Sequence, residues 1–247
     1  MSIQQREIES RNQEAANFDA WYLGTKGILH DRVERESILD ALKLGEGDTV
    51  LDAGCGTGRI TLEIAKRVSK VYALDFAPAC IEVLNRKLRE RGIDNVETHV
   101  ADITKALPVV DQVDKVVSVQ VVQHIPSEAH RNRAVENMYG QFKPGGACVI
   151  TVYNYDSLLN RRLAKEGEFE GGVYYFRFNS QEATELLKRP GFQRISTTGC
   201  VNFRGYAYLS NRGLHRLLSP VARLDVFLSK LAVSRFMGAY LLCRGVK

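Results

Sequence analysis

The hydrophobic residues of this 247-residue chain recur with two different periods. Short apolar runs typical of buried strands alternate with longer stretches in which apolar residues return every three or four positions. The expected strands are residues 49–53, 70–74, 96–101, 114–119, 146–153, 193–202 and 238–243. The clearest helices between them are residues 58–68, 77–91 and 127–142. Strands that alternate with helices indicate βαβ units and a parallel sheet.

The last two expected strands have no crossover helix between them, which fits an antiparallel hairpin at the sheet edge. The predicted fold class is therefore α/β, a doubly wound, Rossmann-like, mostly parallel seven-stranded sheet with an antiparallel edge hairpin and helical additions. We expect one domain: residues 1–45 as an N-terminal helical cap, 46–205 and 237–247 as the core, and 206–236 as a helical insertion. Residues 156–172 are polar and read as a loop.

Composition narrows the class of protein without naming its chemistry. Hydrophobic residues make up 45% and charged residues 26% of the chain, which is ordinary for a globular protein and argues against extended disorder. We find no apolar leader at the N-terminus and no uninterrupted apolar run that could span a membrane. The five cysteines form no CxxC pair and no zinc-type spacing. These features predict a reduced, cytoplasmic protein without a metal.

The charge is unevenly distributed along the chain. Residues 186–247 contain eleven lysines and arginines and a single acid, Asp225. This asymmetry favours an anionic partner, although a solvated basic surface explains it equally well. Within this part an apolar stripe lies opposite a basic one, so peripheral contact with an anionic lipid surface is a hypothesis. The stripes consist of Leu224, Leu228 and Leu231, and of Arg223, Lys230 and Arg235.

The strongest chemical signal is the stretch 50–58, Val-Leu-Asp-Ala-Gly-Cys-Gly-Thr-Gly, where a buried strand enters a glycine-rich turn that opens a helix. Glycines let the backbone turn sharply and let a ligand approach closely. A dinucleotide fingerprint would need glycine where Arg59 stands, and no GK[ST] of a P-loop follows. Asp52 places a carboxylate at the strand tip, which suits a ligand that carries a cationic amine.

Two further acids follow the next two strands. Asp75 follows the strand 70–74 and could accept hydrogen bonds from both hydroxyls of a ribose, with Phe76 lying along an adenine ring. Asp102 follows the third strand and could accept the adenine amino group, with Ile103 packed on the ring. Together with the glycine turn, these acids predict one ligand crevice at the carboxyl edge of the sheet.

These segments resemble the class I S-adenosylmethionine-dependent methyltransferases, in the broad subgroup that includes small-molecule and quinone methyltransferases. The matching pieces are residues 51–58, 74–75, 101–102, 120–125 and 142–146, and together they cover roughly residues 49–153. The remaining chain resembles the family only loosely.

The resemblance implies a role for particular residues in binding S-adenosylmethionine. The glycine turn would cradle the methionine part, Asp75 the ribose and Asp102 the adenine. Backbone at Val119 and Gln120 would line the methionine side, and Tyr22 would close over the cofactor. The turn consists of Gly54, Cys55, Gly56, Thr57 and Gly58.

The activity implied is methyl transfer to a small-molecule acceptor, hydrophobic or anionic, with S-adenosylhomocysteine as the product. His124, just beyond the fourth strand, is the candidate general base because its usual pKa lies near neutrality. A purely structural role at the start of the following helix is the alternative. Aromatic residues could line the acceptor site or belong to the core: Trp21, Tyr22, Tyr153, Tyr155, Tyr174 and Tyr175.

Two other functions stay open at this point. The basic C-terminal part would suit an RNA methyltransferase, but residues 120–123 read Gln-Val-Val-Gln rather than the Asn/Asp-Pro-Pro-aromatic motif of such enzymes. A non-catalytic relative that only binds the cofactor is the second alternative. The sequence leaves open the accepting atom and the oligomeric state.

Overall fold

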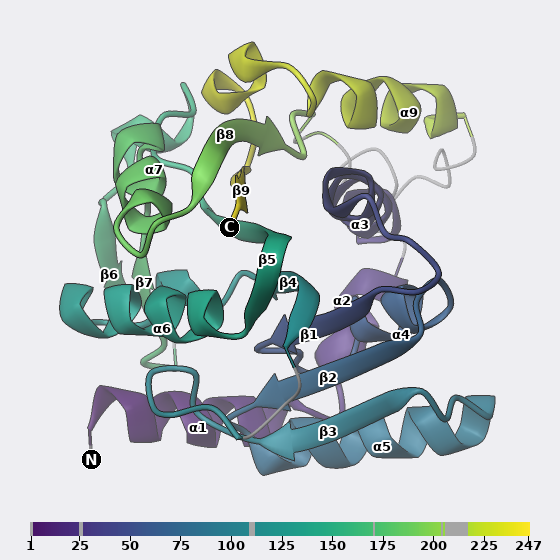
Figure 1. The fold of residues 1–247 in the computed structure, drawn as a ribbon. Helices are drawn as coiled ribbons and strands as arrows, with labels where there is room; N and C mark the ends of the chain where they lie inside the picture. The colour runs from purple at the N-terminus through teal and green to yellow at the C-terminus, as the bar shows by residue number, and fades with distance from the viewer. Residues whose placement is uncertain (1, 25–26, 109–111, 170, 204, 206–216) are drawn as a thin grey trace.

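The computed structural model describes residues 2–24, 27–108, 112–169, 171–203, 205 and 217–247. Its centre is a seven-stranded sheet with the order β3-β2-β1-β4-β5-β9-β8 (Figure 1). The strands are β1 (Thr49–Ala53), β2 (Lys70–Asp75), β3 (Val96–Val100), β4 (Val113–Val119), β5 (Phe142–Tyr153), β8 (Gln193–Cys200) and β9 (Tyr240–Val246).

Strands β1 to β5 are mutually parallel, and β9 runs antiparallel to both β5 and β8. The predicted fold class is therefore confirmed, including the antiparallel pair at one edge. The chain reverses its strand order between β1 and β4, which is the position where open α/β sheets bind ligands.

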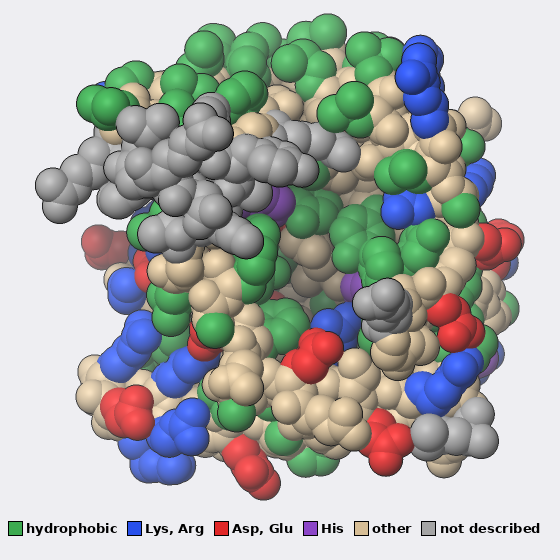
Figure 2. Space-filling model, turned by 180° about the vertical axis from the view of Figure 1, so that it is seen from behind, with side chains coloured by type: hydrophobic (Ala, Val, Ile, Leu, Met, Phe, Trp, Pro, Cys, Tyr) green, Lys and Arg blue, Asp and Glu red, His purple; other side chains and the backbone are tan. Residues whose placement is uncertain are grey.

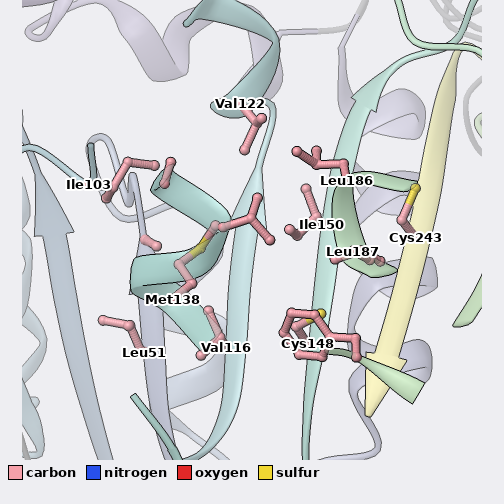
Figure 3. Close-up of a cluster of buried hydrophobic side chains, with 14 of the residues drawn as sticks. Leu51, Ile103, Val116, Val122, Met138, Cys148, Ile150, Leu186, Leu187 and Cys243 are labelled. Carbon is pink, nitrogen blue, oxygen red and sulfur yellow. The ribbon is translucent and has the colours of Figure 1, made fainter. Parts of the chain in front are cut away.

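Helices cover both faces of the sheet, as the continuous apolar strands require. On one face α3 (Ile28–Leu42), α4 (Thr61–Ala65) and α5 (Pro78–Arg91) pack over the sheet, and α6 (Glu128–Gly140) and α7 (Ser180–Lys188) cover the other (Figure 1). Neighbouring strand residues point to opposite faces: Val50 packs with α3, whereas Leu51 packs with α6. Figure 3 shows the cluster of buried side chains between the sheet and helices α6 and α7, where Met138 of α6 lies among side chains from several strands.

The N-terminal region, expected as a helical cap, forms three helices. These are α1 (Ile3–Glu14), α2 (Phe18–Leu23) and α3. A capping box joins Ser2 and Gln5 at the start of α1. The helix packs against α5, where the Asn12 side chain accepts a hydrogen bond of 3.1 Å from the backbone N–H of Ala79.

Several expected boundaries were wrong. Strand β5 begins at Phe142 rather than at residue 146. The register between β4 and β5 shifts after the first pair: Val113 pairs with Phe142, and the next pair is Lys115 with Ala147. Residues 143–146 form the irregular part of β5 between these two pairs. The segment expected as a loop contains β6 (Glu166–Glu168), which pairs with β7 (Tyr174–Phe176). Strand β9 also runs further, to Val246.

The expected helical insertion is described only from residue 217 onward, so residues 206–216 lie outside the described residues. Beyond them α9 (Ser219–Leu228) begins with a proline in its first turn, and η4 (Ala232–Phe236) follows as a short 3-10 helix. Helix α9 lies beside α3 (Figure 1).

Candidate functional site

A cavity of about 770 Å³ opens at the carboxyl ends of β1, β2 and β4, beneath α1. This volume is in the range of small-molecule and cofactor sites. Every residue proposed from the sequence for cofactor binding or catalysis lines this cavity, with Gly58 as the exception. The lining residues among those proposed are Tyr22, Asp52, Gly54, Cys55, Gly56, Thr57, Asp75, Phe76, Asp102, Ile103, Val119, Gln120 and His124.

The glycine turn places its backbone where a side chain would not fit. Gly54 has φ +87°, and a Cβ there would lie 2.2 Å from a methyl group of Val121. Gly58 has φ +88°, and its Cβ would lie 2.3 Å from Leu84 of α5. Gly54 therefore brings the chain close to the cavity wall, whereas Gly58 permits tight packing between the turn and α5.

Asp75 organises the turn from the end of β2. Its Oδ2 accepts a hydrogen bond of 2.8 Å from the N–H of Gly56, and its Oδ1 accepts one of 2.9 Å from the N–H of Ala77. Burial raises the pKa of Asp75, and these two donors work against that rise. A carboxylate can accept about four hydrogen bonds, so Asp75 keeps capacity for the hydroxyl groups of a ligand.

Asp52 lies deeper in the cavity wall, at the end of β1. Burial raises its pKa to about 7, against the hydrogen bond of 2.6 Å that the Thr61 hydroxyl donates to its Oδ2. A cationic ligand group nearby would favour the ionised carboxylate and lower this pKa again. The environment of Asp52 is therefore suited to an ammonium group.

Asp102 faces the cavity from the loop after β3. Its Oδ1 accepts hydrogen bonds from the N–H and the hydroxyl of Thr104, and its Oδ2 accepts one of 2.6 Å from the Gln4 side chain. Burial alone would raise the pKa of Asp102, but these donors outweigh it and lower the pKa below its usual value. Asp102 is thus an ionised acceptor. Ile103, buried beside it, supplies an apolar wall.

Helix α1 forms the lid of the cavity with polar side chains that the sequence analysis did not single out. They are Gln4, Glu7, Arg11 and Glu14. Arg11 lies 3.4 Å from Glu7, and burial raises the pKa of Glu7 to about 7. Their spacing of three, four and three residues places them on one face of α1, the face toward the cavity.

Arg59, which sequence reasoning used only to exclude a dinucleotide fold, joins the turn to α3. Its guanidinium lies 2.9 Å from Asp31 and 2.8 Å from Glu34, and 4.4 Å over the ring of Tyr22. Burial alone would lower the pKa of Arg59, but Glu34 and the other partners raise it. Glu34, with no exposed surface, also accepts a hydrogen bond of 2.6 Å from Gln120.

A second network joins the turn to α2. The Thr57 hydroxyl donates a hydrogen bond of 2.7 Å to Asp19, and Lys87 of α5 pairs with the same carboxylate. The Lys87 ammonium also donates to the Thr57 carbonyl at 2.6 Å. Helix α2, which carries Tyr22, is therefore fixed relative to the turn.

His124 is buried in η1 (Val122–His124), at the far side of the cavity. Its Nδ1 lies 2.7 Å from the carbonyl of Tyr174, which can only accept, so Nδ1 carries the proton. Its Nε2 then accepts a hydrogen bond of 3.3 Å from the side-chain Nε2 of Gln123. Burial lowers the pKa of His124 to about 3, and Arg11 contributes to this decrease.

The cavity wall beyond His124 is aromatic and apolar. Tyr153 lies edge-on to His124, with the ring centres 5.7 Å apart, and 6.1 Å from Phe169. Val173 completes this part. Of the six aromatic residues considered from the sequence, Tyr22 and Tyr153 line the cavity, whereas Tyr174 and Tyr175 are buried in β7.

Comparison with known proteins identifies the family. Residues 44–191 match the family described as "Methyltransferase domain". The chain belongs to this family. The match covers the glycine turn, all three acids at the strand ends and His124.

Curated relatives of this methyltransferase-family chain share parts of its sequence. A probable cobalt-precorrin-6B C(15)-methyltransferase (decarboxylating) of Methanothermobacter thermautotrophicus is 34% identical over 44% of this chain and 54% of its own length. A phosphoethanolamine N-methyltransferase of Triticum aestivum is 31% identical over 85% of this chain and 42% of its own. The chain thus spans about half the length of these relatives.

Among solved structures, phosphoethanolamine N-methyltransferase 2 of Haemonchus contortus, in complex with S-adenosyl-L-methionine, has a similar fold. Its TM-score is 0.63 at 19% identity, over 93% of this chain and 58% of that protein. At this identity the likeness concerns the fold of the methyltransferase domain alone.

Proposed function

We propose that this chain binds S-adenosylmethionine in the cavity and transfers its methyl group to a small-molecule acceptor. The observation that carries the proposal is the convergence of Asp52, Asp75 and Asp102, from three successive strand ends, on one cavity entered by a glycine turn. The three carboxylates differ in environment, and each environment suits a different part of the cofactor. The family membership supports the same conclusion.

The residues present fit the cofactor part by part. Asp75 has acceptor capacity for the ribose hydroxyls, and Asp102 is an ionised acceptor for the adenine amino group, with Ile103 and Phe76 as apolar walls. Asp52 suits the ammonium of the methionine part. When bound, the cofactor supplies a methyl group already activated by its sulfonium.

The chain's own contribution is orientation and exclusion of water. Proximity of this kind is worth roughly 7–11 kcal/mol of the barrier for two well-oriented reactants. Helix α1 covers the cavity, and its Gln4 and Asn12 fasten it to the loop after β3 and to α5. The aromatic wall around Tyr153 and Phe169 is the place we assign to the acceptor.

A small acceptor is favoured over RNA by the shape of the site. The cavity is covered by α1 and is lined on its far side by Phe169 and Val173. The names of two of the curated relatives refer to cobalt-precorrin-6B and phosphoethanolamine, both small molecules. We further propose that the chain is one methyltransferase domain of a cytoplasmic protein that contacts membranes peripherally.

His124 stays a candidate for the catalytic residue. Its Nε2 carries the lone pair, as a base requires, but a pKa of about 3 gives it little affinity for a proton at neutral pH. Methylation of an acceptor that is already nucleophilic requires no base. In that case His124 orients β7 through the Tyr174 carbonyl.

Turnover of S-adenosylmethionine carrying a labelled methyl group tests the proposal. Small amphiphilic, phenolic and anionic acceptors would be offered in parallel with bulk tRNA, and S-adenosylhomocysteine formation measured. We expect acceptor-dependent turnover with a small molecule that the Asp75→Ala variant loses. Labelling of tRNA alone would assign the RNA alternative, and cofactor binding without turnover by any acceptor would favour a non-catalytic relative.

A further inference from the structure

Helix α9 presents large apolar side chains to solvent. Its inner face packs Ala222 into a small cluster with Val33 of α3, and there Asp225 accepts hydrogen bonds from the backbone N–H groups of Asn202 and Phe203. On the outer face Leu224 and Phe227 are 55% and 56% exposed. A surface helix normally shows the opposite arrangement, with its polar residues outward.

This apolar face continues beyond α9 into two neighbouring segments. The backbone N–H of Leu158 donates a hydrogen bond of 3.0 Å to the carbonyl of Phe236, and the Asn154 side chain donates one of 2.6 Å to the carbonyl of Arg235. The first bond joins residues 158–163 to η4, and the second joins η4 to the residue after β5. Figure 2 shows hydrophobic side chains gathered along the top of the molecule, over this region.

We call this region the α9 surface and define it by its exposed apolar residues, which are each 40% to 74% exposed. Many large apolar side chains exposed on one part of the surface are unusual on a protein that meets only water, and they mark an interaction site. The residues are Leu158, Leu159, Leu163, Leu217, Leu224, Phe227, Leu231, Val233, Phe236 and Met237.

The charges on the α9 surface all have one sign. Residues 158–163 and 217–237 contain one acid, Asp225, which lies on the buried face of α9. Of the basic residues, Lys230 has a carboxylate partner among the described residues, Asp40 at 2.7 Å. The basic residues of the two segments are Arg161, Arg162, Arg223, Lys230 and Arg235.

We propose that the α9 surface docks onto the headgroup region of an anionic lipid bilayer. Leucine and phenylalanine side chains together with arginine and lysine are what an interfacial helix presents to such a surface. No helix in the described parts of the chain is long and apolar enough to cross a bilayer, so contact would be peripheral. The proposal does not depend on methyl transfer.

The charge also argues against a second copy of the chain as the occupant. A two-fold contact places the same surface against itself, so the arginines of one copy would meet those of the other. Like charges facing each other in an interface oppose association. An anionic bilayer instead attracts these positive charges.

Flotation with lipid vesicles tests this assignment. Wild-type protein should float with phosphatidylglycerol–phosphatidylcholine vesicles, not with pure phosphatidylcholine, and high salt should release it. The variant Arg161→Gln/Arg162→Gln/Arg223→Gln should bind more weakly by about fivefold for each charge removed. Leu224→Gln/Phe227→Gln should also reduce binding, because both side chains would enter the interface.

A matched control removes one exposed basic and one exposed apolar residue far from α9, in α5 and β3. Arg86→Gln/Val100→Gln should float like wild type. Circular dichroism shows that each variant is folded. Absence of wild-type flotation, or equal flotation of the α9-surface variants and the control variant, would overturn the proposal. So would a dimer in sedimentation equilibrium that Leu224→Gln/Phe227→Gln dissociates, since it would assign the surface to a second copy.

Discussion

Replacing Arg59 by methionine removes the positive charge that balances two carboxylates while keeping most of the side-chain volume. Arg59 lies 2.9 Å from Asp31 and 2.8 Å from Glu34. Breaking a buried ion pair costs roughly 3–5 kcal/mol, because the remaining charge stays desolvated. Glu34 keeps the hydrogen bond from Gln120, and Asp31 keeps Arg35 at 3.5 Å. We therefore expect the lower end, about 3 kcal/mol.

Urea unfolding followed by circular dichroism measures this loss. The denaturant midpoint should fall while the slope stays constant, as for a change in stability alone. In the double variant Arg59→Met/Glu34→Gln the buried charge is absent, so about half of the lost free energy of unfolding should return. The coupling between the two positions should be about 1–3 kcal/mol, as is typical of residues in direct contact.

Two results would refute this reasoning. A loss below about 1 kcal/mol for Arg59→Met would show that the pair behaves like a solvent-exposed one. Additive losses in the double variant would show that Arg59 does not compensate the charge of Glu34.

Three further predictions concern the cavity. Gly54→Ala places a Cβ 2.2 Å from Val121 at a φ of +87°, so calorimetry should show at least tenfold weaker S-adenosylhomocysteine binding, and unchanged affinity would contradict the tight turn. The pKa of Glu7 rises from 4.5 to about 7 on folding, so the protonated carboxyl contributes at most about 3 kcal/mol to the free energy of unfolding. This contribution is complete below pH 4.5 and is lost as the pH rises through 7. Urea titrations should show a flatter pH dependence for Glu7→Gln, and identical curves would contradict the burial of the carboxyl. The pKa of His124 is about 3, so the pH–rate profile of turnover between pH 5 and 8 should have the same shape for wild type and His124→Gln. An inflection near pH 6.5 that the variant loses would instead assign His124 as the general base.

Strands β1 and β2 were predictable because they are buried on both faces. Such strands are continuous apolar runs, and β1 and β2 were placed to within a residue. The pair β6–β7 was missed because each strand has three residues and β6 reads Glu-Gly-Glu, which has no apolar face. Helix boundaries were predicted less well. The helix expected from residue 58 begins at Thr61 as α4, because the apolar pattern does not distinguish the turns before it from helix.

The strand-end acids of the candidate site were placed by topology alone. Carboxyl ends of parallel strands share one edge, so Asp52, Asp75 and Asp102 had to lie near each other. The contribution of α1 could not be predicted in this way, because nothing in its own sequence shows which element it covers. Glu7 and Arg11 enter the cavity through tertiary packing against α5, a contact distant in sequence.

Isothermal titration of the purified protein with S-adenosylhomocysteine tests the central claim most directly. Wild-type protein should bind in the micromolar range, and Asp75→Ala should lose at least tenfold in affinity because it removes the ribose acceptor and the partner of the Gly56 N–H. Circular dichroism of the variant separates this loss from unfolding. No binding by folded wild-type protein, or equal binding by Asp75→Ala, would contradict the cofactor site.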